Sequence, residues 1–279
     1  MTATRITFAA PARELADLGG AIEAAAARVL RSGEYVLGDD VARFEAAFAQ
    51  TCDVAHVVGV SSGSDALVGA LLAVGVTPGD VVVVPAYSFV ATAEAIVRVG
   101  ATPRYCDVTA DEALLDVERA AAIFEGARAV LVVALYGRLP DVASLRALGL
   151  PVVIDAAQAV GVDGALAAGD VACASFYPSK ALGAAGDAGA CATNDTTIAA
   201  RLREIRQHGL VDRHRYARVG GNFRLDAIQA AILEAKLPRL PARMARRNAI
   251  SRALRQALGL DPSQRPTSPF VAVRVVDRD

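Results

Sequence analysis

The chain has 279 residues, a formal net charge of −1 and 54% hydrophobic residues. This length suits one large α/β domain with a smaller second part, and the hydrophobic content is sufficient for a sizeable core. The balanced charge argues against nucleic acid or an anionic membrane surface as a partner.

Cysteine usage and the N-terminal sequence both predict a cytoplasmic protein. The four cysteines have no metal-type spacing and three lie in apolar, strand-like segments, so we expect reduced core thiols and no metal site. No signal peptide is expected, because the N-terminus lacks a basic region followed by an apolar one. The most apolar stretch, 81–99, contains Pro85, Glu94 and Arg98, and therefore predicts a strand, a turn and a helix rather than a membrane span.

Short β-branched runs alternate with alanine-rich segments of helical periodicity along most of the chain. Strands are predicted at 56–60, 81–85, 103–107, 129–135, 151–155, 173–177 and 189–193. Helices are predicted at 21–31, 41–50, 64–74, 91–99, 116–124, 142–148 and 196–208. Continuously apolar strands imply burial on both faces, so we expect an α/β fold with a mostly parallel, seven-stranded sheet between helices. Ligands of such sheets gather at the carboxyl ends of the strands.

The C-terminal part has a different pattern. A helical periodicity runs from 225 towards 258 with breaks near Pro238 and Pro241, and a connector rich in proline and serine follows. The last strand-like run, 270–276, cannot form a sheet alone. It must pair with an earlier strand, pair with another subunit, or be the remnant of a missing domain. We therefore divide the chain into a large domain, 1–238, and a helix with a reduced small C-terminal domain, 239–279.

Lys180 stands out because only two of the 29 lysines and arginines are lysines, the other being Lys236. A desolvated lysine can act as an amine nucleophile and form a Schiff base, whereas arginine cannot. Lys180 follows the strand predicted at 173–177 and precedes a glycine-rich run, 181–187. The alternative is an ordinary lysine at a junction between a strand and a loop.

Two polar groups also follow predicted strands. In the turn 61–65, Ser64 is the expected N-cap of the next helix, and this helix start either forms a plain cap or cradles a phosphate. Asp155 ends an apolar strand. It is either a helix cap, with Gln158 in the capping-box position, or a functional carboxylate in a place of low dielectric.

Phe89 and the segment 222–224 complete the set of candidate groups. Phe89 either presents a flat apolar face to an aromatic cofactor or packs in the core. Asn222, which follows two glycines, belongs either to a ligand-binding loop or to an interface turn. Together the candidates supply an amine, an anion cradle, a carboxylate and an aromatic face, which are the parts needed to hold pyridoxal 5'-phosphate (PLP).

Five motifs in a fixed order carry a resemblance to a known family. They are VSSGSDAL (60–67), VPAYSFVAT (84–92), DAAQA (155–159), SFYPSK (175–180) and GNFRLDAIQAA (221–231). From 35 to 247 the chain resembles the DegT/DnrJ/EryC1/StrS family of PLP-dependent nucleotide-sugar aminotransferases, which have the fold-type I architecture. The resemblance implies a homodimer with composite sites. It also implies transfer of an amino group from glutamate to a nucleotide-linked keto-sugar.

The resemblance implies a role for each matched residue. Lys180 would form the Schiff base with PLP and shuttle protons, and Asp155 would keep the pyridine nitrogen protonated. Gln158 would hydrogen-bond near the phenolic oxygen, while Phe89 would stack on the ring. The remaining cofactor-binding positions would be Ser62, Gly63, Ser64, Ser175 and, reaching the neighbouring subunit's cofactor, Asn222.

The sequence departs from the family pattern in places that spare the PLP residues. Ala181 stands where the family usually has asparagine, the segment 138–150 is shortened, and the chain stops at Asp279, where the family continues into a C-terminal domain. The alternatives to a sugar aminotransferase are therefore a non-catalytic or regulatory homologue that keeps the fold and possibly PLP, or another PLP reaction such as cyclitol transamination. Dehydratases of this family replace the lysine with histidine, so Lys180 argues against dehydration.

Overall fold

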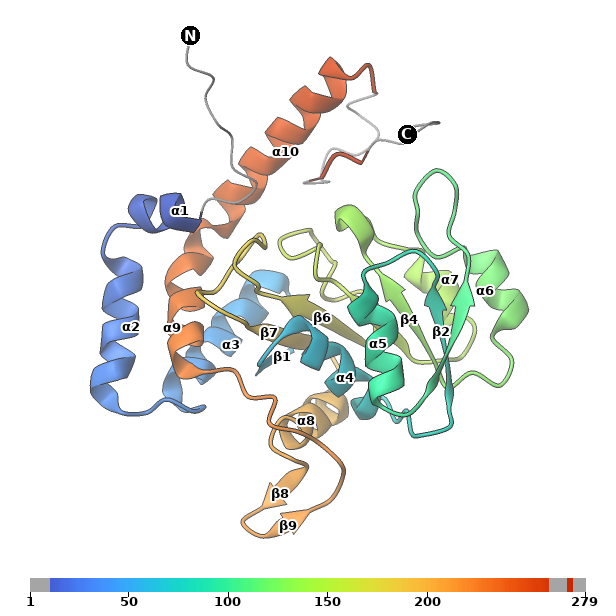
Figure 1. Ribbon diagram of the computed structural model, residues 1–279, viewed down its shortest axis with the longest axis horizontal. Coiled ribbons are helices and arrows are strands. Elements are labelled where there is room, and N and C mark those ends of the chain that lie inside the picture. The colour runs from blue at the N-terminus through green and yellow to red at the C-terminus, as the bar shows by residue number, and fades with distance from the viewer. Residues whose placement is uncertain (1–10, 261–269, 273–279) are drawn as a thin grey trace.

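A seven-stranded sheet lies at the centre of the computed structural model, which describes residues 11–260 and 270–272 (Figure 1). The strands are β1 (His56–Val60), β2 (Val81–Pro85), β3 (Thr102–Cys106), β4 (Ala129–Val133), β5 (Val152–Asp155), β6 (Val171–Ser175) and β7 (Gly189–Thr193). Their spatial order is β1-β7-β6-β5-β4-β2-β3. All neighbouring pairs are parallel except the two that β7 makes. The mostly parallel sheet predicted from sequence is confirmed.

The carboxyl ends of six strands meet at one edge of this sheet. β7 runs antiparallel to both β1 and β6, so β1 points in the same direction as β6 and the parallel strands beside it. The turn after β1, the loop after β2, the end of β5 and the segment after β6 therefore share this edge. Ligands bind at such edges in α/β sheets.

Helices cover both faces of the sheet. They are α1 (Pro11–Asp17), α2 (Ala21–Ser32), α3 (Asp39–Cys52), α4 (Gly63–Ala73), α5 (Val90–Arg98), α6 (Val117–Ile123), α7 (Val142–Arg146), α8 (Thr196–Ile205), α9 (Ala227–Lys236) and α10 (Leu240–Ala257). In β2, Val82 and Val84 pack in the core shared with α4, α5 and α8, whereas Val83 packs in the core shared with α2, α3, α6, α7 and α9. Burial on both faces explains why the strands read as continuous apolar runs.

Some boundaries differ from those expected from sequence. The expected strand 129–135 ends at Val133, because the chain turns into a short 3-10 helix, η1 (Leu135–Gly137), in which Tyr136 has a φ of 58°. The expected helix 196–208 ends at Ile205, and His208 has a φ of 62°, which a right-handed helix cannot contain. The helix α1 and the small hairpin of β8 (Leu210–Asp212) and β9 (Arg215–Tyr216) were not expected.

The C-terminal helical segment is interrupted near its two prolines, as predicted from the sequence. It divides into α9, a short 3-10 helix η2 (Leu237–Arg239) and α10, with Pro238 and Pro241 at the starts of the last two. Of the strand expected at 270–276, the described residues 270–272 are not in a strand, and the remainder lies outside the described residues. The division into domains 1–238 and 239–279 stays a prediction.

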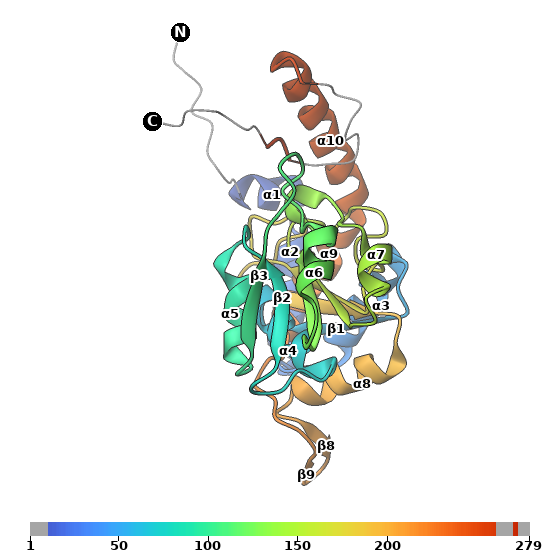
Figure 2. The same cartoon turned by 90° about the vertical axis from the view of Figure 1, so that its right-hand side faces the viewer.

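Two elements extend beyond the layered body. Both views show the β8–β9 hairpin projecting past α8, and α10 running away from the sheet (Figures 1 and 2). In the part of the chain that the structure describes, no helix combines the length and the apolar character that crossing a membrane requires.

Three phenylalanines fix the segment that follows β6 to the helix layer. The Phe176 ring makes edge contacts with Phe44 at 5.5 Å and with Phe48 at 5.1 Å between centroids, and all three side chains are fully buried. Such aromatic contacts add to the stabilisation from burial alone. Phe176 therefore anchors the backbone only four residues before Lys180.

We expect Phe176→Ala to lower the free energy of unfolding by about 3–5 kcal/mol, because it leaves a cavity among packed rings. Urea denaturation followed by circular dichroism measures this, since the chain has no tryptophan. Phe89→Ala is the matched control. The Phe89 side chain is 73% exposed, so its loss should change stability by less than about 0.5 kcal/mol. Equal effects of the two changes would contradict the anchoring role of Phe176.

Candidate active site

A cavity of about 400 Å³ opens at the carboxyl edge of the sheet. The residues that line it come mainly from the turn after β1, the loop after β2, the ends of β4 and β5 and the segment after β6. They include every residue predicted from sequence except Asn222, namely Ser62, Gly63, Ser64, Phe89, Asp155, Gln158, Ser175 and Lys180. The structure thus brings the predicted residues together, while their individual roles stay predictions.

Asp155 is the last residue of β5 and only 7% exposed. Its Oδ2 accepts a hydrogen bond from the Thr92 hydroxyl at 2.9 Å, and its Oδ1 accepts one from the Ala157 backbone N–H at 3.1 Å. Burial raises the pKa of Asp155, whereas these hydrogen bonds and the charge of Lys180 oppose the rise. No helix follows β5 before β6, so Asp155 is not a helix cap and no capping box with Gln158 forms.

Lys180 lies in the turn after β6, half-buried in the cavity wall. Burial lowers the pKa of its ammonium group, and the nearby Asp155 carboxylate partly opposes this. A lowered pKa increases the fraction of neutral amine, which is the nucleophilic form. The same cavity therefore favours an uncharged Lys180 and, through desolvation, destabilises an unpartnered Asp155 charge.

Side chains of α9 and α10 hold the loop that follows Lys180. Lys236 Nζ donates to the Gly183 carbonyl at 2.5 Å, and Arg243 donates to the Ala181 carbonyl at 2.9 Å. Glu14 of α1 forms ion pairs with both cations. Ala181, where the resemblance expects asparagine, is thus held through its backbone carbonyl. The second lysine of the chain, 7% exposed, has its ammonium group committed to this network.

The turn after β1 forms a candidate anion cradle at the start of α4. Ser62, not Ser64, is the N-cap, because its hydroxyl accepts a hydrogen bond from the Asp65 backbone N–H at 3.0 Å. The first helical backbone bond runs from Ala66 to Ser62, so the N–H groups of Gly63 and Ser64 precede it. Such N–H groups, together with the helix dipole, attract an anion.

Glycines let three segments approach one another around this cradle. A Cβ on Gly63 would lie 2.7 Å from the Ser175 Cβ, and a Cβ on Gly189 would overlap the Ser62 carbonyl group. Any side chain at these positions would force the turn after β1 away from β6 and β7. The close approach is what places the Ser175 side chain beside the start of α4.

Gln158 is oriented by a direct hydrogen bond from the short 3-10 helix η1. Its Oε1 accepts a hydrogen bond from the Tyr136 backbone N–H at 2.7 Å, which leaves its Nε2 as a donor. Tyr136 takes a left-handed backbone conformation in η1 to present that N–H. Its hydroxyl lies 3.1 Å from that of Tyr87, and this hydrogen bond raises the pKa of Tyr136. The sequence did not predict a role for Tyr136, because nothing in the residues around it indicates a contact with Gln158.

Asn222 is exposed and outside the set of cavity-lining residues. Its segment pairs with Gln207 near the base of the hairpin, and the following residue, Phe223, accepts a backbone hydrogen bond from Ser61. Asn222 therefore lies on a segment that touches the turn after β1. Within one chain, however, Asn222 does not line the cavity that contains the other candidate residues.

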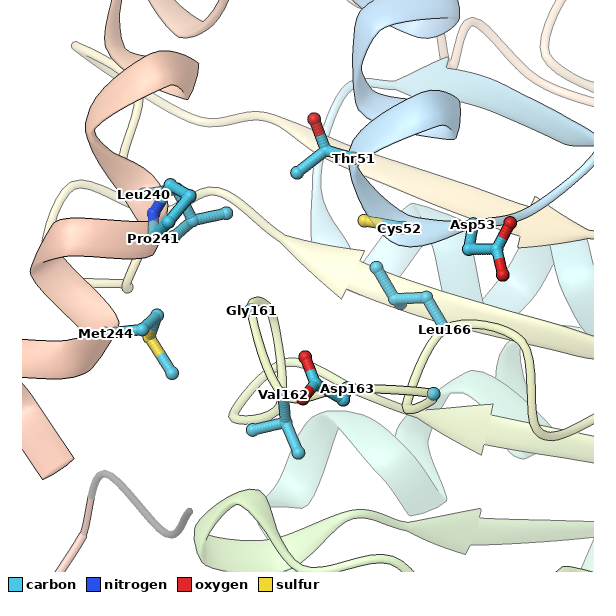
Figure 3. A pocket seen from close by; sticks show the side chains of 11 residues that line it. Thr51, Cys52, Asp53, Gly161, Val162, Asp163, Leu166, Leu240, Pro241 and Met244 are labelled. Carbon is cyan, nitrogen blue, oxygen red and sulfur yellow. The ribbon is translucent and has the colours of Figure 1, made fainter.

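A second cavity, of about 310 Å³, lies between the end of α3, the loop 161–166 and the start of α10 (Figure 3). Its one thiol, Cys52, has a pKa raised to about 12 by burial, so it stays protonated. The Leu240 and Met244 side chains supply apolar walls. This cavity lacks the amine and the buried carboxylate that the first cavity combines, so we assign the candidate active site to the first.

Comparison with known proteins shows the family to which the chain belongs. The DegT/DnrJ/EryC1/StrS aminotransferase family matches residues 16–269, which is most of the chain. The chain belongs to this family. Its membership accounts for the order of the five motifs and for the shared position of Lys180 and Asp155 at one sheet edge.

Individual members of the DegT/DnrJ/EryC1/StrS family are similar over most of the chain. A dTDP-3-amino-3,4,6-trideoxy-alpha-D-glucose transaminase from Streptomyces venezuelae is 43% identical over 84% of this chain. The match covers 64% of that relative, so the chain spans less than two thirds of its length. The structure of S. venezuelae DesV with a ketimine intermediate has a TM-score of 0.85 and 40% identity, covering 91% of this chain and 70% of DesV.

A second relative of known structure carries a bound cofactor. NtdA from Bacillus subtilis, solved with bound cofactor PMP, has a TM-score of 0.85 and 28% identity, covering 97% of this chain and 66% of NtdA. These likenesses confirm the expected architecture, an α/β fold shared with aminotransferases of this family.

The Lys236 network gives a stability prediction. We expect Lys236→Met to lower the free energy of unfolding by about 1–3 kcal/mol, because the buried Gly183 carbonyl loses its hydrogen bond. Urea denaturation of the cofactor-free protein measures this. Lys180→Met is the matched control, since it removes the other lysine, whose ammonium group is desolvated without such a backbone bond. The control should be at least as stable as the unchanged protein. A reversed order of the two variants would contradict the assignment.

Proposed function

We propose that this protein is a PLP-dependent aminotransferase, which moves an amino group from glutamate to a keto-sugar linked to a nucleoside diphosphate. The observation that supports it most is that Lys180 and Asp155 line one cavity beside the N-terminus of α4. The name of the Streptomyces transaminase supports the sugar-nucleotide substrate, and the cofactor bound to NtdA supports the cofactor class.

The residues of the cavity fit PLP. The volume of about 400 Å³ lies in the range of small-molecule sites. The N–H groups of Gly63 and Ser64 and the hydroxyls of Ser62 and Ser175 would bind the phosphate. When bound, PLP supplies a ring that accepts electrons from the substrate carbon.

Three side chains would orient the ring. Asp155 is buried, and its ionised form would need a cationic partner. It would therefore hold a proton on the pyridine nitrogen. Gln158 would donate from Nε2 to the phenolic oxygen, since Tyr136 already uses its Oε1. Phe89, which is 73% exposed in the isolated chain, would cover one face of the ring.

Lys180 would have two tasks. Its Nζ is the attachment point for the cofactor, because burial lowers its pKa and so favours the nucleophilic amine. After the amine of the substrate has displaced it, the Lys180 nitrogen would act as a proton shuttle. It would accept a proton from the substrate carbon and then donate it at a second position. The Lys236–Arg243–Glu14 network would keep the backbone of the following loop fixed, so that only the Lys180 side chain moves.

We further propose a homodimer in which Asn222 completes the partner's site. A two-stranded hairpin is marginally stable when it stands alone, yet β8–β9 projects from the body (Figures 1 and 2). Exposed apolar side chains lie on and beside it, with Tyr216 at 65% and Val219 at 81%. A partner subunit would cover this surface and receive Asn222. A cytoplasmic location is also proposed, in keeping with four free thiols.

The first test follows nitrogen transfer. We expect the purified protein to gain a visible absorption band with PLP, and to move labelled nitrogen from glutamate to a member of a panel of dTDP- and UDP-keto-sugars. Lys180→Arg keeps the charge but cannot attach the cofactor, so transfer should fall by at least about 10²–10⁴-fold. A protein that binds PLP yet transfers nitrogen to no sugar in the panel would contradict the substrate class and favour a non-catalytic homologue.

The second test mixes two defective variants. In a dimer of Lys180→Ala and Asn222→Ala subunits, the site that keeps Lys180 also receives the intact Asn222 of the other subunit. We therefore expect unfolding and refolding of the mixture to restore PLP binding beyond the sum of the separate variants. Binding equal to that sum would contradict a composite site, as would a monomer by light scattering.

A further inference from the structure

Thr92 lies behind the candidate site and contacts its carboxylate. It belongs to the first turn of α5, and its side chain is fully buried. Its Oγ1 lies 2.9 Å from Asp155 Oδ2 and 2.8 Å from the hydroxyl of Ser88, which lines the cavity.

The direction of these hydrogen bonds follows from counting protons. An ionised carboxylate only accepts hydrogen bonds, so the single hydroxyl proton of Thr92 must point to Asp155. Ser88 must then donate to Thr92. When Asp155 is ionised, the hydroxyl protons of Ser88 and Thr92 therefore both have an acceptor. With Oδ1 held by the Ala157 N–H, each carboxylate oxygen has one fixed donor and keeps lone pairs for a ligand.

Few other groups oppose the cost of burying this charge. Two titratable groups face Asp155, the Lys180 ammonium and the Cys173 thiol, whose own pKa burial raises. The burial of Lys180 lowers its pKa, which weakens the cation as a counter-charge. The two fixed donors, Thr92 and the Ala157 N–H, are thus permanent features that favour the ionised form.

We propose that Thr92 is a positioning residue that keeps Asp155 ionised and aims its carboxylate at the pyridine nitrogen of the cofactor. This inference rests on the proposed function, because it assumes PLP in the cavity. Ser88 orders the Thr92 hydroxyl, so the two residues act through Asp155 and touch no reacting atom. Thr92 accordingly affects the binding of the cofactor and not the binding of the sugar.

The substitution that tests this is Thr92→Val, which keeps the volume and removes the donor. Asp155 then loses one of its two fixed donors, so its pKa rises further above the usual value. Pairing with the ring nitrogen needs the ionised carboxylate. A higher Asp155 pKa means that this form is lost earlier as the pH falls, so the acid limit of PLP binding moves to higher pH.

Two readouts separate this inference from the proposed function. In the cofactor-free protein, a carbon-13 NMR titration of the Asp155 carboxyl should give a higher pKa in Thr92→Val than in the unchanged protein. In the presence of PLP, the dissociation constant should rise about tenfold or more at neutral pH, with the acid limit displaced upward. Thr92→Ser retains the hydroxyl and should behave as the unchanged protein in both measurements.

A matched control is Thr193→Val. Thr193 is equally buried, at 2% exposed, but its hydroxyl donates to the Asp170 carbonyl, away from the cavity. It should leave the Asp155 titration unchanged. An Asp155 pKa that is the same in Thr92→Val and the unchanged protein overturns the inference, as does an equal shift in Thr92→Ser. An unchanged protein that stays colourless with PLP overturns the proposed function instead.

Discussion

The buried carboxylate of Asp155 is the constraint on which the site depends. It ends the central strand β5, in surroundings that penalise charge, and the protein opposes that penalty with the Thr92 hydroxyl and the Ala157 N–H. A cationic ring nitrogen would be the missing counter-charge. The same desolvation lowers the pKa of Lys180 and so prepares its amine for attachment. The same apolar environment thus shifts the two pKa values in opposite directions, upward for Asp155 and downward for Lys180.

Geometry around this pair is fixed from both sides. On one side, glycines at 63 and 189 let the start of α4 come against β6 and β7, which places the candidate anion cradle beside Ser175. On the other, Lys236 and Arg243 hold the carbonyls that follow Lys180. These restraints come from segments far apart in the chain. They leave the side chain of Lys180 as the part that can move, which is what a group with two tasks requires.

Local sequence was sufficient to predict the sheet, because doubly buried strands are continuously apolar. It also predicted that most candidate residues would gather at one edge, because the carboxyl ends of such strands converge, and their individual roles stay predictions. It could not identify the contacts that tune the site. Thr92 meets Asp155 across 63 positions, and Glu14 meets Arg243 across 229. Local reasoning also placed the N-cap at Ser64, although the helix starts earlier, at Gly63, with Ser62 as its cap.

The most direct test of this account uses the two lysines of the chain. Borohydride reduction of the protein with PLP, followed by peptide mapping, reports which amine carries the cofactor. Lys180 faces the cavity with a lowered pKa, whereas Lys236 is bound to the Gly183 carbonyl and Glu14. The account predicts a single pyridoxyl group on the Lys180 peptide. A pyridoxyl group on Lys236, or none on either peptide, would contradict it.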